Sequence, residues 1–349
     1  MKQIGIVLHN LGGPTSLDAI RPFLTNLFLD PEIIRIPLPK PFDRLFPRTL
    51  FAWFVARRRT PKVRPNYEAI GGRSPLNDRS EEQARALENE LNERFNGIAR
   101  FHVRLGMRYW HPFTRVAMDE FEKLGIRDVF LLPLYPQYSR TTSGSSFKEW
   151  RDLHRTAFAK RFRVKAAKDY HLHPRFIAAI NERIDATLRD RFSDDERANV
   201  NLLFSAHGTP MSEVYAGDPY SHQIRATVRA VMDARGNDLA YHESFQSRVG
   251  PVKWLEPYTQ DKLAELGAKG VRTLLVVPVA FVTDHIETLH ELDIELREVA
   301  EHAGITKYEV MYALNDGAGF IGALADVVQA RYAIDLMRAN DVATMETHA

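Results

Sequence analysis

The segment that decides the fold is Gly125-Ile-Arg-Asp-Val-Phe-Leu-Leu-Pro-Leu134, which ends a helix, runs through a short apolar strand and stops at a proline. The pattern returns 145 residues later as Gly270-Val-Arg-Thr-Leu-Leu-Val-Val-Pro-Val279. A second echo links Asn10-Leu-Gly-Gly-Pro14 with Ala206-His-Gly-Thr-Pro210, each at the end of a predicted strand. Two echoes in the same order predict a duplicated unit, although parallel sheets in general share such patterns.

Outward from these segments, short β-branched runs alternate with stretches of helical periodicity, which is typical of parallel sheets covered by helices. The predicted strands are 3–8, 101–105, 129–134, 162–166, 202–206, 240–245, 273–279 and 308–311. The predicted helices are 80–95, where Ser80 starts a capping box, and 113–124, 174–192, 219–235, 259–266, 283–301 and 320–337. The fold class is therefore α/β, with domains at 1–168 and 169–318 and a final helix, about 319–349, packing back on the first domain.

Composition narrows the class of protein. Among 349 residues, 44% are hydrophobic and 26% are charged, which excludes disorder as the main theme. A net charge of +2 disfavours a nucleic-acid partner bound through bulk charge. Cysteine is absent, which excludes disulfides, a cysteine nucleophile and a cysteine-ligated cluster. No apolar run reaches the roughly 20 residues that span a bilayer, and the N-terminus lacks a signal-peptide pattern, so we expect a cytoplasmic protein.

A histidine stands at the carboxyl end of the apolar strand Leu202-Leu-Phe-Ser-Ala-His207. Ligands of open α/β sheets bind at this edge, so the imidazole is a candidate base or metal ligand. A structural histidine is the competing interpretation. With an ordinary pKa of about 6.5, His207 would be mostly neutral at pH 7.

Carboxylates recur along the helix predicted for 283–301. At about 100° per residue, Asp284, Glu287, Glu291 and Glu295 would fall within an arc of about 80°. Like charges at this spacing destabilise a helix by about 0.2–0.5 kcal/mol per pair, so local stability does not favour them. A solvated helix start explains the first two carboxylates but not the others. The row, which begins beside His285, could carry hydrated divalent cations or protons.

Three further segments could bind ligands or surfaces. Arg57–Lys62 and Tyr135–Ser146 are predicted loops with guanidinium and hydroxyl donors suited to carboxylates or phosphates, and neither is a Walker A loop. Phe42–Phe54 is rich in aromatic residues with arginines on its flanks. It could be a core helix, the lip of an apolar pocket, or a contact with an anionic membrane.

Together these segments resemble the ferrochelatases, which insert ferrous iron into a porphyrin to make haem. The resemblance runs over nearly the whole chain. Its motifs, in the family's order, are Asn10–Pro14, Phe28–Asp30, Arg58–Lys62, Ile70–Pro75, Gly106–Pro112, Tyr135–Ser139, Thr142–Ser146, Phe204–Gly208, Gly217–Tyr220, Phe245–Pro251, Trp254–Pro257 and Phe281–Glu295. It implies two similar Rossmann-like domains, each a four-stranded parallel sheet flanked by helices, with the active-site cleft between them.

The resemblance also implies the roles of single residues. His207 and Glu287 would be the catalytic and metal-binding pair, and Asp284, His285, Glu291 and Glu295 the acidic, partly π-helical track. Propionates would be held by Arg59, Tyr67 and Ser74. The remaining porphyrin-binding positions would be Leu11, Arg108, Tyr109, Tyr135, Ser139, Trp254 and Phe281.

The implied substrates are protoporphyrin IX and Fe²⁺, with no permanent cofactor and, for want of cysteine, no [2Fe–2S] cluster. Phe42–Phe54 would make the peripheral contact with the inner membrane. The sequence departs from the family at Arg73, where a glycine is common, and at Gly208-Thr-Pro210 after the histidine. The alternatives are a chelatase for another tetrapyrrole, such as coproporphyrin III, or for another metal, and a non-catalytic tetrapyrrole carrier.

Overall fold

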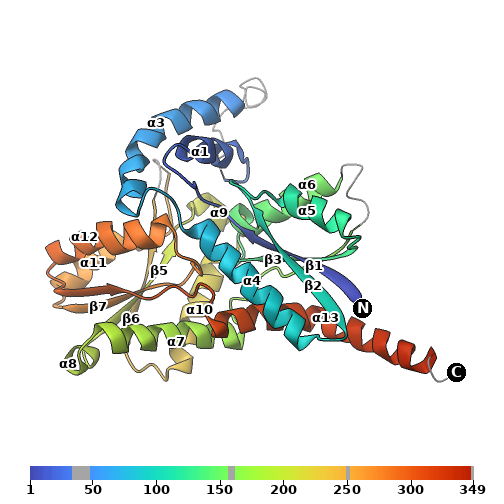
Figure 1. Ribbon diagram of the computed structural model, residues 1–349. Coiled ribbons are helices and arrows are strands. Elements are labelled where there is room, and N and C mark those ends of the chain that lie inside the picture. Colours follow the sequence, from blue (N-terminus) through green and yellow to red (C-terminus); the bar gives the residue numbers. More distant parts are fainter. Residues whose placement is uncertain (34–47, 156–161, 249–251, 347–349) are drawn as a thin grey trace.

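The computed structural model describes residues 1–33, 48–155, 162–248 and 252–346, with the backbone alone for 333–346. Two four-stranded parallel sheets lie side by side (Figure 1). The first has the order β2-β1-β3-β4 and the second β6-β5-β7-β8, so both place their strands in the same sequence. The strands are β1 (Lys2–Asn10), β2 (Ala99–Met107), β3 (Asp128–Pro133), β4 (Arg163–Ala166), β5 (Asn201–His207), β6 (Ala240–Gln246), β7 (Thr273–Pro278) and β8 (Lys307–Val310). The predicted α/β duplication is confirmed.

Helices cover both faces of each sheet. They are α1 (Ile20–Leu29), α3 (Arg48–Ala69), α4 (Leu76–Arg94), α5 (Thr114–Lys123), η1 (Arg140–Gly144), α6 (Ser145–His154), α7 (Pro174–Arg191), α8 (Asp194–Arg197), α9 (Met211–Tyr215), α10 (Tyr220–Ala234), α11 (Thr259–Ala268), η2 (Glu287–Glu295), α12 (Leu296–His302) and α13 (Ala318–Glu346). In β1, Ile6 and Leu8 join the core beneath α4, whereas Val7 faces α5, because side chains alternate along a strand.

The largest apolar core joins the two halves. It contains Leu8 of β1 and Phe204 of β5, with buried residues of α4, α7, α10 and α13 between the sheets. Helix α13, red in Figure 1, touches both α4 and α7. Its Tyr332 packs edge-on against Phe130, with ring centroids 5.9 Å apart, and its Phe320 lies 6.3 Å from Phe176. The last helix therefore bridges both halves, and the domain boundary at residue 168 stays a prediction.

Helix α4 begins at Leu76, four residues before the predicted start, so the capping box at Ser80 is wrong. Pro75 occupies the N-cap position. Ser80 is fully buried, and its hydroxyl accepts a hydrogen bond from Asn10 Nδ2 at 3.0 Å. The serine is a tertiary contact of the first strand, which local sequence cannot distinguish from a helix start.

The basic segment Arg57–Lys62 is helical, which corrects the predicted loop. It lies inside α3 although Pro61 and Pro65 each remove a backbone donor, a loss that costs about 3 kcal/mol in a helix interior. Packing compensates, because Ala52 and Ala56 of α3 are fully buried in a cluster with α1. Of the Phe42–Phe54 segment, residues 42–47 lie outside the described residues, and the rest opens α3.

Side chains close the outer edge of β2. Asn92 of α4 donates to the Phe101 carbonyl at 3.0 Å and accepts from its N–H at 2.8 Å. The Val103 N–H donates to the Glu88 carboxylate at 2.7 Å, and Arg104 donates to the Val103 carbonyl at 2.8 Å. The outward backbone groups of Phe101 and Val103 on this edge strand are thus paired within the chain. Within the described ranges, no helix is both long and apolar enough to cross a membrane.

Candidate active site

Glu287, at the start of η2, lies between two histidines. His207 ends β5 and places Nε2 3.4 Å from Glu287 Oε1. His285 follows β7 and places Nε2 2.8 Å from Glu287 Oε2. The other ring nitrogens face carbonyls, with His207 Nδ1 2.6 Å from Gly208 O and His285 Nδ1 3.0 Å from Thr283 O. Because β5 and β7 are adjacent parallel strands, their carboxyl ends bring these groups together.

The hydrogen bonds define the protonation of His207. A carbonyl oxygen only accepts, so Nδ1 carries a hydrogen, and Nε2 can donate to Glu287 only in the doubly protonated imidazolium. Burial lowers the pKa of His207, but the charge and hydrogen bond of Glu287 outweigh it and raise that pKa to about 9. Burial opposes ionisation of Glu287, yet His207 and His285 hold its pKa well below the usual 4.5. The direction of this shift runs against the expectation, drawn from the sequence, of a mostly neutral His207 at pH 7.

The predicted row of carboxylates is not one α-helical face. Residues 287–295 form a π-helix, whose i→i+5 hydrogen bonds change the angle per residue. Asp284 precedes the helix and accepts a hydrogen bond from Asn315 Nδ2 at 2.8 Å. Glu295, at the other end, is exposed.

Glu291, one turn beyond Glu287, has its own partners. Its carboxylate accepts from the N–H of Ser247 at 2.7 Å and also from the Ser247 hydroxyl and Gln246 Nε2. Burial, and then the charge of Glu287, raise the pKa of Glu291. Neither Gln246 nor Ser247 was singled out from the sequence as a site residue. The only signal for them was the segment Phe245–Pro251, which carries part of the family resemblance.

One wall of the site is apolar and aromatic. Leu11, Tyr67 and Tyr109 belong to a single cluster that Ile286 packs against, and α3 touches η2. Burial, and next the charge of Glu287, raise the pKa of Tyr67, so its hydroxyl stays protonated near that carboxylate. Tyr109 is only 1% exposed and donates its hydroxyl hydrogen to a carboxylate inside the wall, rather than presenting it at the surface.

That carboxylate, Asp30, anchors Arg108. The guanidinium lies 2.9 Å from Asp30 and 3.4 Å from Glu149, and it donates to Ser145 Oγ at 2.8 Å. Burial raises the pKa of Tyr135, while Arg108 lowers it and Glu287 raises it, so this phenol lies within reach of both charges. Asp30 entered the sequence analysis only as part of the segment Phe28–Asp30, with no role assigned, and Glu149 was missed, since nothing in local spacing shows that the two share one arginine.

The segment around Ser74, predicted to bind a propionate, packs closely against the Gly13–Pro14 turn that follows β1. A Cβ on Gly13 would lie 2.5 Å from the Ser74 side chain, so this approach requires glycine. The Ser74 N–H donates to the Pro14 carbonyl at 2.9 Å, and Ser74 is 4% exposed. Arg59 is half-buried in α3, and no carboxylate of the described residues lies within ion-pair distance of it. It is a cation available to an acidic ligand.

The two halves also meet beside the site. Ser139 of the first half donates to Asp218 at 3.0 Å, and Arg140 pairs with Glu213 at 2.5 Å. Aromatic rings lie against both histidines. The Trp254 ring centroid is 6.2 Å from that of His207, and the Phe281 centroid is 4.6 Å from that of His285.

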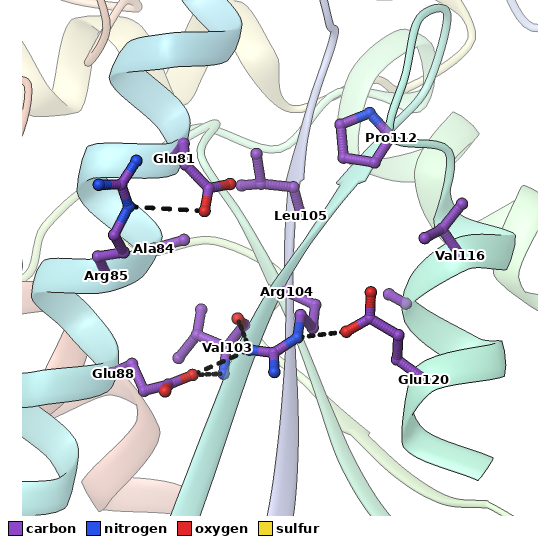
Figure 2. A pocket seen from close by; sticks show the side chains of 11 residues that line it. Glu81, Ala84, Arg85, Glu88, Val103, Arg104, Leu105, Pro112, Val116 and Glu120 are labelled. Atoms are coloured by element: carbon purple, nitrogen blue, oxygen red, sulfur yellow. Dashed lines mark hydrogen bonds and ion pairs between the residues drawn. The ribbon is translucent and has the colours of Figure 1, made fainter. Parts of the chain in front are cut away.

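A separate hollow of about 290 Å³ lies on the first half, over β2 (Figure 2). Arg104 sits in it with ion-pair distances of 3.1 Å to Glu88 and 2.6 Å to Glu120. Its residues take no part in the histidine pair, so the hollow is not the candidate active site. Among the described residues, no group of three or more His, Cys, Asp or Glu side chains is arranged to hold a metal ion.

We predict that Glu287→Gln returns the pKa of His207 from about 9 toward 6.5, because the opposing charge is lost. Imidazole chemical shifts measured by NMR against pH report the midpoint. Glu295→Gln, which removes an exposed carboxylate of the same helix, is the control and leaves the midpoint in place. An unchanged midpoint in Glu287→Gln contradicts the ion pair.

The raised pKa of His207 also determines how its ion pair with Glu287 affects the free energy of unfolding as pH changes. The folded-state pKa of His207 lies above its unfolded value, so the pair stabilises the fold fully below pH 6.5 and loses this contribution as pH rises through about 9. The stability difference between wild type and His207→Gln should shrink over that window in urea titrations.

Comparisons with known proteins identify the family of this chain. The family model for ferrochelatase matches residues 3–332. The ferrochelatase of Gloeobacter violaceus is 47% identical over 330 residues, which cover 94% of this chain and 97% of the relative. The ferrochelatase of Thermosynechococcus vestitus is 46% identical over 333 residues, covering 94% and 82%.

A solved structure, SirB from Bacillus subtilis with Fe³⁺, aligns over 94% of this chain and 95% of its own with a TM-score of 0.52. At 10% identity this likeness shows a shared fold alone. The sequence matches reach further, because they extend over nearly the whole chain at more than 40% identity. The chain belongs to the ferrochelatase family.

Proposed function

We propose that this protein inserts Fe²⁺ into protoporphyrin IX to form protohaem, the terminal step of haem biosynthesis. The observation that carries the proposal is the Glu287 carboxylate shared by His207 and His285 at the carboxyl ends of β5 and β7. A base and a negatively charged ligand are the two groups that metallation of a porphyrin needs. Membership of the ferrochelatase family supports the reaction.

The wall residues fit a flat, apolar macrocycle with acidic side chains. Leu11 and Phe281 are partly exposed and offer apolar contact to the ring, as does Trp254 beside His207. Arg59 offers a guanidinium to a propionate, a pair that forms charge-assisted hydrogen bonds. Arg108, whose charge two carboxylates already offset, is assigned to shaping the wall.

Ring distortion would expose the pyrrole nitrogens. A flat porphyrin holds its four nitrogens in the ring plane, and two of them carry hydrogens. Contacts to the apolar faces and propionates can offset roughly 1–5 kcal/mol of bending strain. The two halves share one core and several hydrogen bonds, which makes a stiff frame for this purpose.

The proton balance assigns a sequence of events to the pair. Two pyrrole N–H protons leave as Fe²⁺ binds the four nitrogens. His207 would first release its own proton to solvent and then accept the two pyrrole protons in turn, passing the first to solvent and keeping the second. Two protons thus reach solvent for each Fe²⁺ inserted, and His207 returns to its starting state. Approach of Fe²⁺ would draw the Glu287 carboxylate toward the cation and remove the charge that holds the proton on His207. Iron is a substrate in this scheme, and the protein needs no permanent cofactor.

An assay of the purified protein with paired porphyrins and metals tests the function. Fe²⁺ and protoporphyrin IX should give the highest kcat/KM. Preference for coproporphyrin III, or for Zn²⁺, which N and O ligands generally bind more tightly than Fe²⁺, would replace the substrate assignment. Stoichiometric porphyrin binding without metallation would instead indicate a carrier.

His207→Ala and Glu287→Gln should each lower kcat for iron insertion by at least about 10²-fold, the usual range for loss of a positioned acid–base group. Porphyrin affinity, measured by fluorescence quenching, should change little because both side chains face the metal. Glu301→Gln, which removes an exposed carboxylate of α12 with no assigned role, is the matched control and should leave kcat unchanged. Near-normal turnover in either variant removes the pair from the mechanism.

Arg59→Leu should raise KM for dicarboxylate porphyrins by about tenfold, which corresponds to one charge-assisted hydrogen bond. The dimethyl esters lack the carboxylate, so their KM should stay within twofold. Arg85→Leu, which removes an exposed arginine paired with Glu81 in the distant hollow, provides the control. Equal effects on acids and esters would argue against a propionate contact.

We also propose that the start of α3 contacts an anionic membrane surface. Leu50, Trp53 and Phe54 are 59%, 44% and 52% exposed. Arg57 lies over the Trp53 ring at 5.5 Å and Arg58 over the Phe54 ring at 5.5 Å, so cations flank the apolar side chains. This arrangement is typical of a helix that lies at a membrane interface.

Replacing Leu50, Trp53 and Phe54 together by serine should lower partitioning onto phosphatidylglycerol vesicles by about tenfold or more, because apolar area and cation placement are both lost. Sedimentation with vesicles measures the partition coefficient. Serine at Val116, Leu124 and Leu172, which are equally exposed but scattered, is the control. Equal binding by both triple variants would contradict the proposal.

A further inference from the structure

We propose that Gln83 is a positioning residue, which sets the geometry of Glu287 from the opposite half of the molecule. The inference rests on the proposed function and goes beyond it, since Gln83 lies in α4 and touches none of the groups assigned to substrate. Iron insertion would then require Gln83, although no local sequence pattern marks this residue as functional.

The contacts of Gln83 all cross from the first half to the second. Its side chain is fully buried, and Nε2 donates to the carbonyls of Val282 at 3.2 Å and Asn315 at 3.0 Å. Its Oε1 accepts from the Thr283 hydroxyl at 3.1 Å. Both donor hydrogens and the acceptor are therefore used, and the residues on the other side precede η2 or follow β8.

The segment from Val282 to Asp284, which Gln83 contacts, is also hydrogen-bonded to Asn315. Asn315 donates its N–H to the Val282 carbonyl at 2.9 Å, accepts from the Asp284 N–H at 3.1 Å and donates through Nδ2 to the Asp284 carboxylate. Asn315 has a φ of 41°, a left-handed conformation that these bonds hold in place. The segment from Val282 to Asp284 thus has one arrangement, and Gln83 fixes its position relative to the first half.

Two further contacts, through His285, link this segment to the Glu287 carboxylate. The Thr283 carbonyl accepts from His285 Nδ1 at 3.0 Å, which orients the ring. The opposite nitrogen, Nε2, lies 2.8 Å from Glu287. Thr283 is therefore in contact with Gln83 through its hydroxyl and with His285 through its carbonyl.

Gln83→Met keeps the length of the side chain but removes all three hydrogen bonds, leaving the Thr283 hydroxyl without its acceptor. A shift of about 1 Å in a catalytic group can cost 10²-fold in rate. We expect kcat to fall by about 10- to 100-fold, with KM for porphyrin within twofold, because the porphyrin walls are not touched.

Asn92→Leu is the matched stability control. Asn92 lies on the same helix and makes two hydrogen bonds, both to the backbone of Phe101 and both distant from η2. It should lower the midpoint of thermal unfolding by an amount comparable to Gln83→Met, with kcat unchanged. A kcat that falls equally in the two variants would show that Gln83 acts through stability alone and would overturn the proposal.

A second pair of variants, at Thr283, tests the proposal if Gln83→Met does not fold. Thr283→Val removes the hydroxyl at constant shape, whereas Thr283→Ser retains it, so the proposal expects loss of kcat in the valine variant and recovery in the serine variant. Equal kcat values for both would overturn it. An inactive wild type would count against the proposed function, while an active wild type with a fully active Gln83→Met counts against the positioning role alone.

Discussion

The carboxylate of Glu287, shared by two imidazoles, is the interaction on which the rest of the site depends. Two histidines from neighbouring strand ends converge on it, and its charge reaches the phenols of Tyr67 and Tyr135. A buried carboxylate persists only when its charge is offset. The imidazoles of His207 and His285 supply this offset for Glu287, and in the proposed reaction an arriving divalent cation would replace it.

The halves of the molecule repeat one strand order but differ in what they contribute. The second half carries both histidines and the π-helix η2, and the first carries Arg59, Tyr67 and the loop that ends in Ser139. Buried glutamines join them: Gln137 donates to Thr227 at 3.1 Å and to the Val279 carbonyl at 3.3 Å, and Gln83 donates to the Val282 carbonyl three residues further along the chain. Glutamine side chains suit this contact between the two halves because an amide both donates and accepts hydrogen bonds. It adds no charge beside a site that already holds several charged groups.

Sequence predicted the eight strands because buried parallel strands are uninterrupted apolar runs bounded by glycine and proline. It took Arg57–Lys62 of α3 for a loop, since Pro61 and Pro65 indicate a break that packing on α1 overrides. It placed the carboxylates on one face because the periodicity assumed 3.6 residues per turn, which a π-helix does not have. His207 and Glu287 were reached through strand position and family resemblance, but the raised pKa of His207 depends on a distance that no spacing encodes.

The closed edge of β2 bears on the behaviour of the newly made chain. An open strand edge can recruit a strand from another molecule and start an aggregate. Asn92, Glu88 and Arg104 bond the outward backbone groups in the middle of this edge, at Phe101 and Val103, and the first two belong to α4, the helix that also holds Gln83. Docking of a single helix therefore both shields the nascent sheet from its neighbours and brings the joint between the halves into place.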